Sequence, residues 1–89
     1  MHVLLAEDDA LIASGIVAGL NAQGLIVDHA ATAADAEALL RAAHFDVLIL
    51  DLGLPDEDGI ALLRRLRQQG LDVEVIHPLT LLARQLSEA

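Results

Sequence analysis

The sequence predicts an α/β domain built on an open parallel sheet. Short apolar runs alternate with segments of helical periodicity four times along the 89 residues. Strands that are separated by helices pair in parallel and are joined by right-handed crossovers. One run, residues 47–51 (VLILD), is apolar up to its final acid, which is typical of a strand covered on both faces. We therefore expect a single domain over residues 1–89 with four strand–helix repeats.

Apolar spacing and one helix cap define the first two repeats. Residues 2–6 (HVLLA) form the first predicted strand and residues 25–30 (LIVDHA) the second. A helix is expected over residues 9–23 because apolar residues recur there at helical spacing. The second helix, residues 33–43, follows Thr32, a residue type that caps helix N-termini. The apolar positions of the first helix are Leu11, Ile12, Ile16 and Leu20.

The last two repeats follow the apolar run at residues 47–51. A loop (GLPDED) leads from this strand into a helix over residues 59–69. A fourth strand over residues 73–76 (VEVI) and a short final helix over residues 79–87 complete the pattern. In the third helix, the spacing predicts that Ile60, Leu63 and Leu66 point inward and that Arg64, Arg65 and Arg67 point largely outward.

Composition restricts the classes of partner. The formal net charge is −9, from 14 acidic residues and 5 basic residues that are all Arg. An acidic surface is repelled by the phosphates of nucleic acids and anionic membranes. There is no Cys and thus no thiolate metal site. No apolar run has the length of a membrane span or the pattern of a signal peptide. We expect a cytoplasmic protein without direct DNA binding or membrane association.

Acidic residues follow two of the predicted strands. Glu7, Asp8 and Asp9 come directly after the first strand, and Asp51 ends the third. In an open parallel sheet, ligands bind beyond the carboxyl ends of the strands. If these strands are neighbours, their carboxylates converge, and a divalent cation such as Mg²⁺ relieves the repulsion. The alternative is structural: Asp9 caps a helix and Asp51 starts a turn.

Two motifs carry a resemblance to a known family. VLLAEDD and LILDLGLPDEDG resemble the receiver domain of response regulators in two-component signalling, especially the OmpR-like subgroup. The resemblance runs almost without gaps from Met1 to about Val75. It implies a flavodoxin-like fold and a phosphoryl group that a sensor histidine kinase donates in the presence of Mg²⁺.

The resemblance also implies roles for individual residues. Asp51 matches the phosphoacceptor, and Glu7 and Asp8 match the acidic pair that holds Mg²⁺ with it. Gly53 matches the position whose backbone carbonyl is a further metal ligand. Pro55 and Gly59 match the residues that shape the loop after the acceptor.

The C-terminal part departs from the family pattern. Receivers have five strand–helix repeats, whereas four are predicted here, which indicates a truncated or internally deleted domain. The family also uses a Ser or Thr after strand four and a Lys after strand five. Either Thr80 is near the hydroxyl position, or His77 replaces the Lys and a repeat is deleted before it. We favour a combination of the two, in which the sequence is regular up to the fourth strand and a deletion junction follows. His77 is then a substitute cation or simply a loop histidine, and no Lys is present under either interpretation.

Three functions remain open from the sequence. The first is a phosphoacceptor module, impaired by the missing repeat and Lys. The second is a phosphorylation-independent interaction or dimerisation module, and the third an inactive fragment. Self-association is expected through the open sheet edge or the final helix, although Glu74 places a charge on that edge. No output domain and no hydrolase arrangement are predicted, so we do not expect a classical enzyme.

Overall fold

The described part of the chain is a three-layer α/β sandwich. The computed structural model describes residues 1–79, which form a parallel sheet with strand order β2-β1-β3-β4. The strands are β1 (His2–Ala6), β2 (Ile26–Ala30), β3 (Val47–Leu50) and β4 (Glu74–Ile76). The helices are α1 (Ala10–Ala22), α2 (Ala33–Ala42) and α3 (Gly59–Gln68). The prediction of an open, four-stranded parallel sheet is confirmed.

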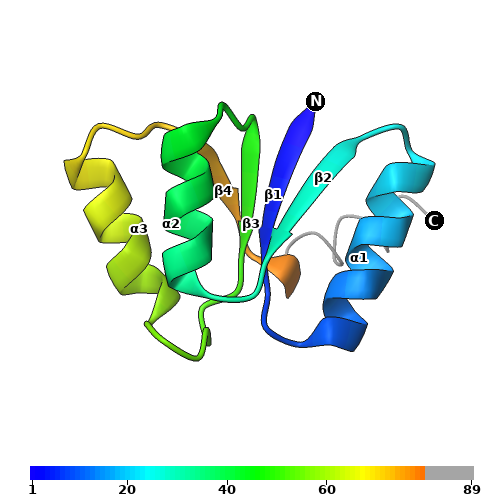
Figure 1. Ribbon diagram of the computed structural model, residues 1–89, viewed down its shortest axis with the longest axis horizontal. Coiled ribbons are helices and arrows are strands. Elements are labelled where there is room, and N and C mark those ends of the chain that lie inside the picture. Colours follow the sequence, from blue (N-terminus) through cyan, green and yellow to red (C-terminus); the bar gives the residue numbers. More distant parts are fainter. Residues whose placement is uncertain (80–89) are drawn as a thin grey trace.

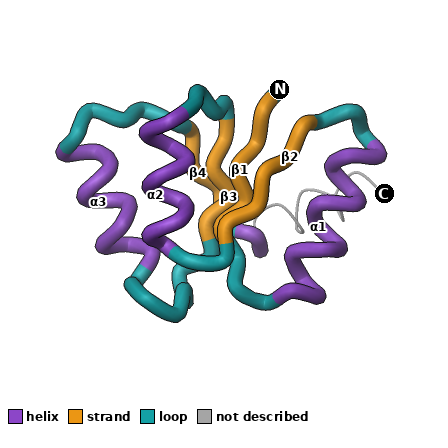
Figure 2. Tube along the Cα trace, viewed as in Figure 1, coloured by secondary structure: helices purple, strands orange, loops and turns teal. Residues whose placement is uncertain are grey.

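The helices cover both faces of the sheet. Figure 1 shows α1 on one side of the strands and α2 with α3 on the other. The tube in Figure 2 shows how each helix returns the chain so that the next strand runs in the same direction. Within residues 1–79, no helix combines the length and apolar character needed to cross a membrane.

Alternating side chains of the central strands fill the two layers of the core. Leu4 and Leu48 are fully buried on the side of α2 and α3. Leu5 and Ile49 are equally buried on the side of α1. Because successive residues of a strand point to opposite faces, an unbroken apolar run supplies both layers. This explains why β1 and β3 occupy the centre of the sheet.

Backbone hydrogen bonds continue the central ladder past the strand ends. β1 pairs in parallel with β3, with Ala6 opposite Leu50. Beyond this pair, Asp51 N donates to Ala6 O at 3.0 Å and Glu7 N donates to Ala30 O at 3.0 Å. These two hydrogen bonds therefore hold Glu7 and Asp51 together at the carboxyl ends of the central strands.

An acidic and a hydroxyl side chain cap the N-termini of the first two helices. Asp9 Oδ1 accepts hydrogen bonds from Leu11 N and Ile12 N, each at 3.0 Å, and caps α1. Thr32 Oγ1 accepts from Asp35 N at 3.1 Å and caps α2, as predicted. The alternative role given to Asp9 by the sequence is therefore the one that the structure shows.

Some helix faces differ from the predicted ones. Ile60 is 44% exposed, whereas Leu62 is fully buried, so the inward face of α3 is rotated from the predicted one. In α1, Leu11 is 84% exposed and Ile12 50%, although the apolar spacing suggested one buried stripe. Arg65 was predicted to point outward but is half-buried between α2 and α3.

The C-terminal predictions are only partly covered by the structure. β4 begins at Glu74 and pairs in parallel with β3, at one edge of the sheet. Glu74 is exposed there, as a charged residue on an edge strand should be. The predicted final helix over residues 79–87 lies outside the described residues except for Leu79.

Candidate acidic site

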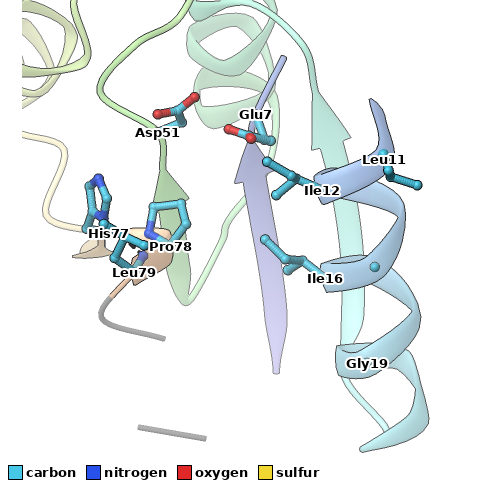
Figure 3. Close-up of a pocket in the computed structure, with 10 residues that line it drawn as sticks. Glu7, Leu11, Ile12, Ile16, Gly19, Asp51, His77, Pro78 and Leu79 are labelled. Carbon is cyan, nitrogen blue, oxygen red and sulfur yellow. Dashed lines mark hydrogen bonds between the residues drawn. The ribbon is translucent and has the colours of Figure 1, made fainter. Parts of the chain in front are cut away.

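Three carboxylates meet where β1 and β3 end. One oxygen from each of Glu7, Asp8 and Asp51 lies within 4.8 Å of the other two. Figure 3 shows Glu7 and Asp51 at the ends of their neighbouring strands. Asp9, which caps α1, is not part of this group. The convergence expected from strand-end acids in a parallel sheet is therefore present.

Glu7 is the buried member of the group. It is 5% exposed, and its Oε2 atom has no hydrogen-bond partner within the described residues. Burial, together with the adjacent Asp51 carboxylate, raises the pKa of Glu7 to about 7. A hydrogen bond from the Glu7 carboxyl group in turn lowers the pKa of Asp51. The two pKa shifts have opposite directions, so Glu7 keeps a proton more readily than Asp51 does.

This group has the chemistry of a divalent-cation site. It offers three hard oxygen ligands, one of them a buried oxygen without a partner. Mg²⁺ prefers such oxygen ligands and usually takes only a few from the protein. The residues present therefore fit a magnesium ion, which would offset the repulsion between their negative charges.

The loop after β3 is held against the Asp51 backbone. Gly53 N donates to Asp51 Oδ1 at 3.1 Å, which orients the carboxylate. Gly59 N donates to Leu52 O at 3.0 Å, and a Cβ atom at Gly59 would lie 2.8 Å from Leu52 Cα. Position 59 is therefore restricted to glycine by close backbone approach, whereas Pro55 lies exposed in the loop between them.

A second set of contacts, which the sequence did not reveal, anchors this loop to α2. Asp56 accepts hydrogen bonds from Ala33 N at 2.8 Å and from Ala34 N at 3.0 Å. These two hydrogen bonds lower the pKa of Asp56. Arg65 bridges the loop and the helix, because it pairs with Glu57 at 2.6 Å and with Glu37 at 3.0 Å. No sequence signal marks such contacts, since the partners of Asp56 are backbone atoms.

His29 is a further residue that sequence reasoning missed. No motif or spacing in the sequence relates His29 to the acidic residues. In the structure, His29 Nε2 lies 2.7 Å from the carbonyl oxygen of Glu7. The side chain thus contacts the backbone that carries two of the three carboxylates.

His77 lies beside the acidic site. It lines a groove of about 630 Å³ with Glu7, Asp51 and apolar residues of α1 (Figure 3). Its Nδ1 accepts a hydrogen bond from Leu79 N at 3.0 Å, which requires a lone pair on that nitrogen. Thr80, the alternative phosphate contact, lies outside the described residues.

Together, the strand order and the carboxylate cluster define a class of protein: a parallel α/β domain with an acidic site at the carboxyl ends of its central strands, β1 and β3. Residues 3–81 match the response regulator receiver domain family. The chain belongs to this family, and the resemblance inferred from the motifs is confirmed.

Similar proteins include transcriptional response regulators. The chain is 44% identical over 82 residues to the transcriptional regulatory protein PmrA of Pectobacterium parmentieri, covering 92% of this chain and 35% of that protein. It is 46% identical over 76 residues to the response regulator protein PmrA of Pseudomonas aeruginosa, covering 85% of this chain and 34% of that protein. The chain thus spans about a third of the length of these relatives.

Solved structures show the same fold. The Francisella response regulator 1452 receiver domain matches with a TM-score of 0.83 and 34% identity, over 85% of this chain and 63% of that one. The MaeR response regulator bound to beryllium trifluoride matches with a TM-score of 0.81 and 30% identity, over 86% of this chain and 65% of that one.

Proposed function

We propose that this chain is a receiver module whose Asp51 accepts a phosphoryl group in a Mg²⁺-dependent reaction. The observation that carries the proposal is the convergence of Glu7, Asp8 and Asp51 within 4.8 Å at the ends of the central strands. Family membership supports it, because response regulators receive phosphoryl groups from sensor histidine kinases. A cytoplasmic sensor histidine kinase domain is accordingly the proposed donor.

Each residue has a distinct part in the proposed reaction. An oxygen of Asp51 attacks the phosphorus, so that an O–P bond forms while the N–P bond to the kinase histidine breaks. The electron pair of that bond remains on the imidazole nitrogen. Gly53 N keeps the attacking carboxylate oriented through its hydrogen bond to Oδ1. Because Asp51 is the ionised member of the pair, its oxygen is available as a nucleophile.

Glu7 and Asp8 are proposed to hold the ion together with Asp51 and the backbone carbonyl of Gly53. When bound, Mg²⁺ supplies positive charge that stabilises the transferred phosphoryl oxygens. The MaeR receiver, a similar protein, has been solved with beryllium trifluoride. This makes beryllium trifluoride a suitable phosphoryl mimic for testing the present site.

The test is phosphorylation by a small phosphoryl donor such as acetyl phosphate, followed by intact mass. We expect addition of one phosphoryl group with Mg²⁺, none after chelation, and none in Asp51→Asn. Asp72→Asn is the matched control, because Asp72 is an exposed aspartate in the loop before β4. Phosphorylation that persists in Asp51→Asn, or that does not need Mg²⁺, would contradict the proposal.

A second candidate function is protein interaction without phosphorylation. It is favoured by the apolar groove beside α1, where Leu11 is 84% exposed, and by the edge position of β4. This function predicts self-association that is unchanged by Asp51→Asn but weakened by Leu11→Gln. Sedimentation velocity at increasing concentration measures it, and a concentration-independent monomer would exclude it.

A further inference from the structure

His29 connects β2 to the backbone of the acidic site. It is the residue before Ala30, where β2 ends. Its Nε2 atom lies 2.7 Å from the carbonyl oxygen of Glu7, the shortest of the hydrogen bonds made by histidine rings in residues 1–79. A carbonyl oxygen can only accept, so Nε2 carries the hydrogen and donates it.

This contact replaces a ladder hydrogen bond that the sheet does not supply. The pairing of β1 with β2 ends at Ala6 and Ala30. Glu7 is one residue further, and its N–H still donates to Ala30 O at 3.0 Å. Its carbonyl oxygen accepts a hydrogen bond from the His29 side chain instead of from a backbone N–H group. Both polar atoms of the Glu7 backbone are therefore fixed by residues at the end of β2.

Fixing the Glu7 carbonyl also fixes the start of Asp8. The carbonyl of Glu7 and the N–H of Asp8 belong to one planar peptide unit. The direction of the oxygen consequently sets the direction in which the chain leaves β1 and the position from which the Asp8 side chain extends. A free carbonyl would allow this peptide to rotate, and the ligand oxygens of Glu7 and Asp8 would then be less well positioned relative to Asp51.

We propose that His29 is a positioning residue for the acidic site: its Nε2–H group holds the Glu7–Asp8 peptide so that both carboxylates face Asp51. The inference rests on the proposed function where Mg²⁺ is concerned, but the geometry of the peptide can be measured without the ion. The requirement is a hydrogen-bond donor at the correct reach rather than a positive charge.

The requirement for a donor defines a matched pair of variants. His29→Gln and His29→Met have side chains of similar length, but only Gln can donate to the Glu7 carbonyl. His29 is exposed, so neither replacement opens a cavity in the core. His44→Met is the control, because His44 is also exposed and its Nε2 contacts Asp46 at 3.4 Å, at the opposite end of the sheet.

The experiment uses the ¹⁵N-labelled full chain and two readouts. The first is the amide signals of Asp8 and Asp9 without Mg²⁺. We expect them to move in His29→Met and to return close to their wild-type positions in His29→Gln. The second is Mg²⁺ titration, in which His29→Met should bind about threefold to tenfold more weakly, the value of one hydrogen bond. His29→Gln should recover most of this affinity, and His44→Met should match the wild type in both readouts.

The outcomes separate this inference from the proposed function. Unmoved Asp8 signals in His29→Met, or Gln and Met variants that behave alike, would overturn the role of His29. If the wild-type chain binds no Mg²⁺, the proposed function fails. The amide signals of Asp8 and Asp9 without Mg²⁺ still decide the inference in that case. It is supported if these signals shift in His29→Met and return in His29→Gln, and it is refuted if they do not shift in His29→Met.

Discussion

At the scale of single residues, the acidic site is a source of instability when no cation is bound. Glu7 is almost fully buried, and one of its oxygens lacks a hydrogen-bond partner among the described residues. Such a group is tolerated most easily when it is protonated, which is why its pKa is raised to about 7. Binding sites are often found where burial and like charges are kept together in this way.

The raised pKa of Glu7 predicts how stability depends on pH without Mg²⁺. Burial raises the pKa of Glu7 from its ordinary value of 4.5 to about 7, so the folded chain binds this proton more tightly than the unfolded chain does. The contribution of this protonated group is therefore complete below pH 4.5 and is lost as the pH rises through about 7. Glu7→Gln, which stays neutral, should lack this dependence.

Urea unfolding of both proteins at several pH values measures the difference. Relative to Glu7→Gln, the wild type should lose up to about 3 kcal/mol between pH 4.5 and pH 8. Mg²⁺ should reduce the loss in the wild type only. Parallel stability curves for the two proteins would show that Glu7 titrates normally.

Gly59 makes a second prediction at this scale. Gly59→Ala would place a Cβ atom 2.8 Å from Leu52 Cα and 2.9 Å from Asp51 O, so that the backbone must move. We expect a loss of about 1–3 kcal/mol in unfolding free energy and weaker Mg²⁺ binding, measured by urea unfolding and metal titration.

The same substitution elsewhere provides the control. Gly19 lies in α1, and a Cβ atom there would have no neighbour within 4 Å. Gly19→Ala should therefore raise stability by about 0.5–1 kcal/mol, because alanine loses less conformational entropy in a helix than glycine. If both variants changed stability in the same direction, close backbone approach would not be the reason for glycine at position 59.

At the scale of elements, α2 depends on a loop that is distant in sequence. Its first turn has one local cap, Thr32, whose Oγ1 accepts from Asp35 N. Two further N–H groups, of Ala33 and Ala34, donate to Asp56 in the loop after β3. The negative charge of Asp56 also lies favourably at the N-terminus of the helix. The helix and the loop after β3 therefore stabilise each other.

Asp56→Asn should weaken this contact and lower the urea midpoint more than the control, Asp72→Asn. Its effect should depend on pH, because the pKa of Asp56 is lowered in the folded chain. A lowered pKa contributes stability above the unfolded value, and the contribution is lost as the pH falls through the folded value. The difference between wild type and variant should consequently be constant near neutral pH and shrink below about pH 4. A difference that does not change in acid would contradict the cap.

At the scale of the whole molecule, the fold and the acidic cluster could be predicted because both depend on patterns along the chain. Apolar runs without alternation indicated central strands, and the acids that follow β1 and β3 were expected to meet if these two strands were neighbours. His29 and Asp56 could not be predicted, since their partners are backbone atoms 22 and 23 residues away. The ion pairs of Arg65 could not be predicted either, because helical spacing does not show that Glu37 and Glu57 lie beside it.

The sheet also predicts an uneven distribution of stability. β1 and β3 are buried along almost their whole length, whereas β4 has three residues, none of them buried, and pairs only with β3 among the described strands. Hydrogen exchange followed by NMR should show slow amides in residues 4–6 and 48–50 and faster exchange at residues 74–76. Equal protection of all three segments would mean that they open together in global unfolding.

The absence of a side chain at Gly59 has a mechanical consequence. The first residue of α3 rests directly on the peptide that follows Asp51, joined by the hydrogen bond from Gly59 N to Leu52 O. No flexible group lies between them to absorb a displacement. A shift of the Asp51 backbone is therefore expected to displace the start of α3, which Arg65 connects to α2 through its ion pair with Glu37. Direct contacts thus connect β3 to α3 at position 59 and α3 to α2 at Arg65.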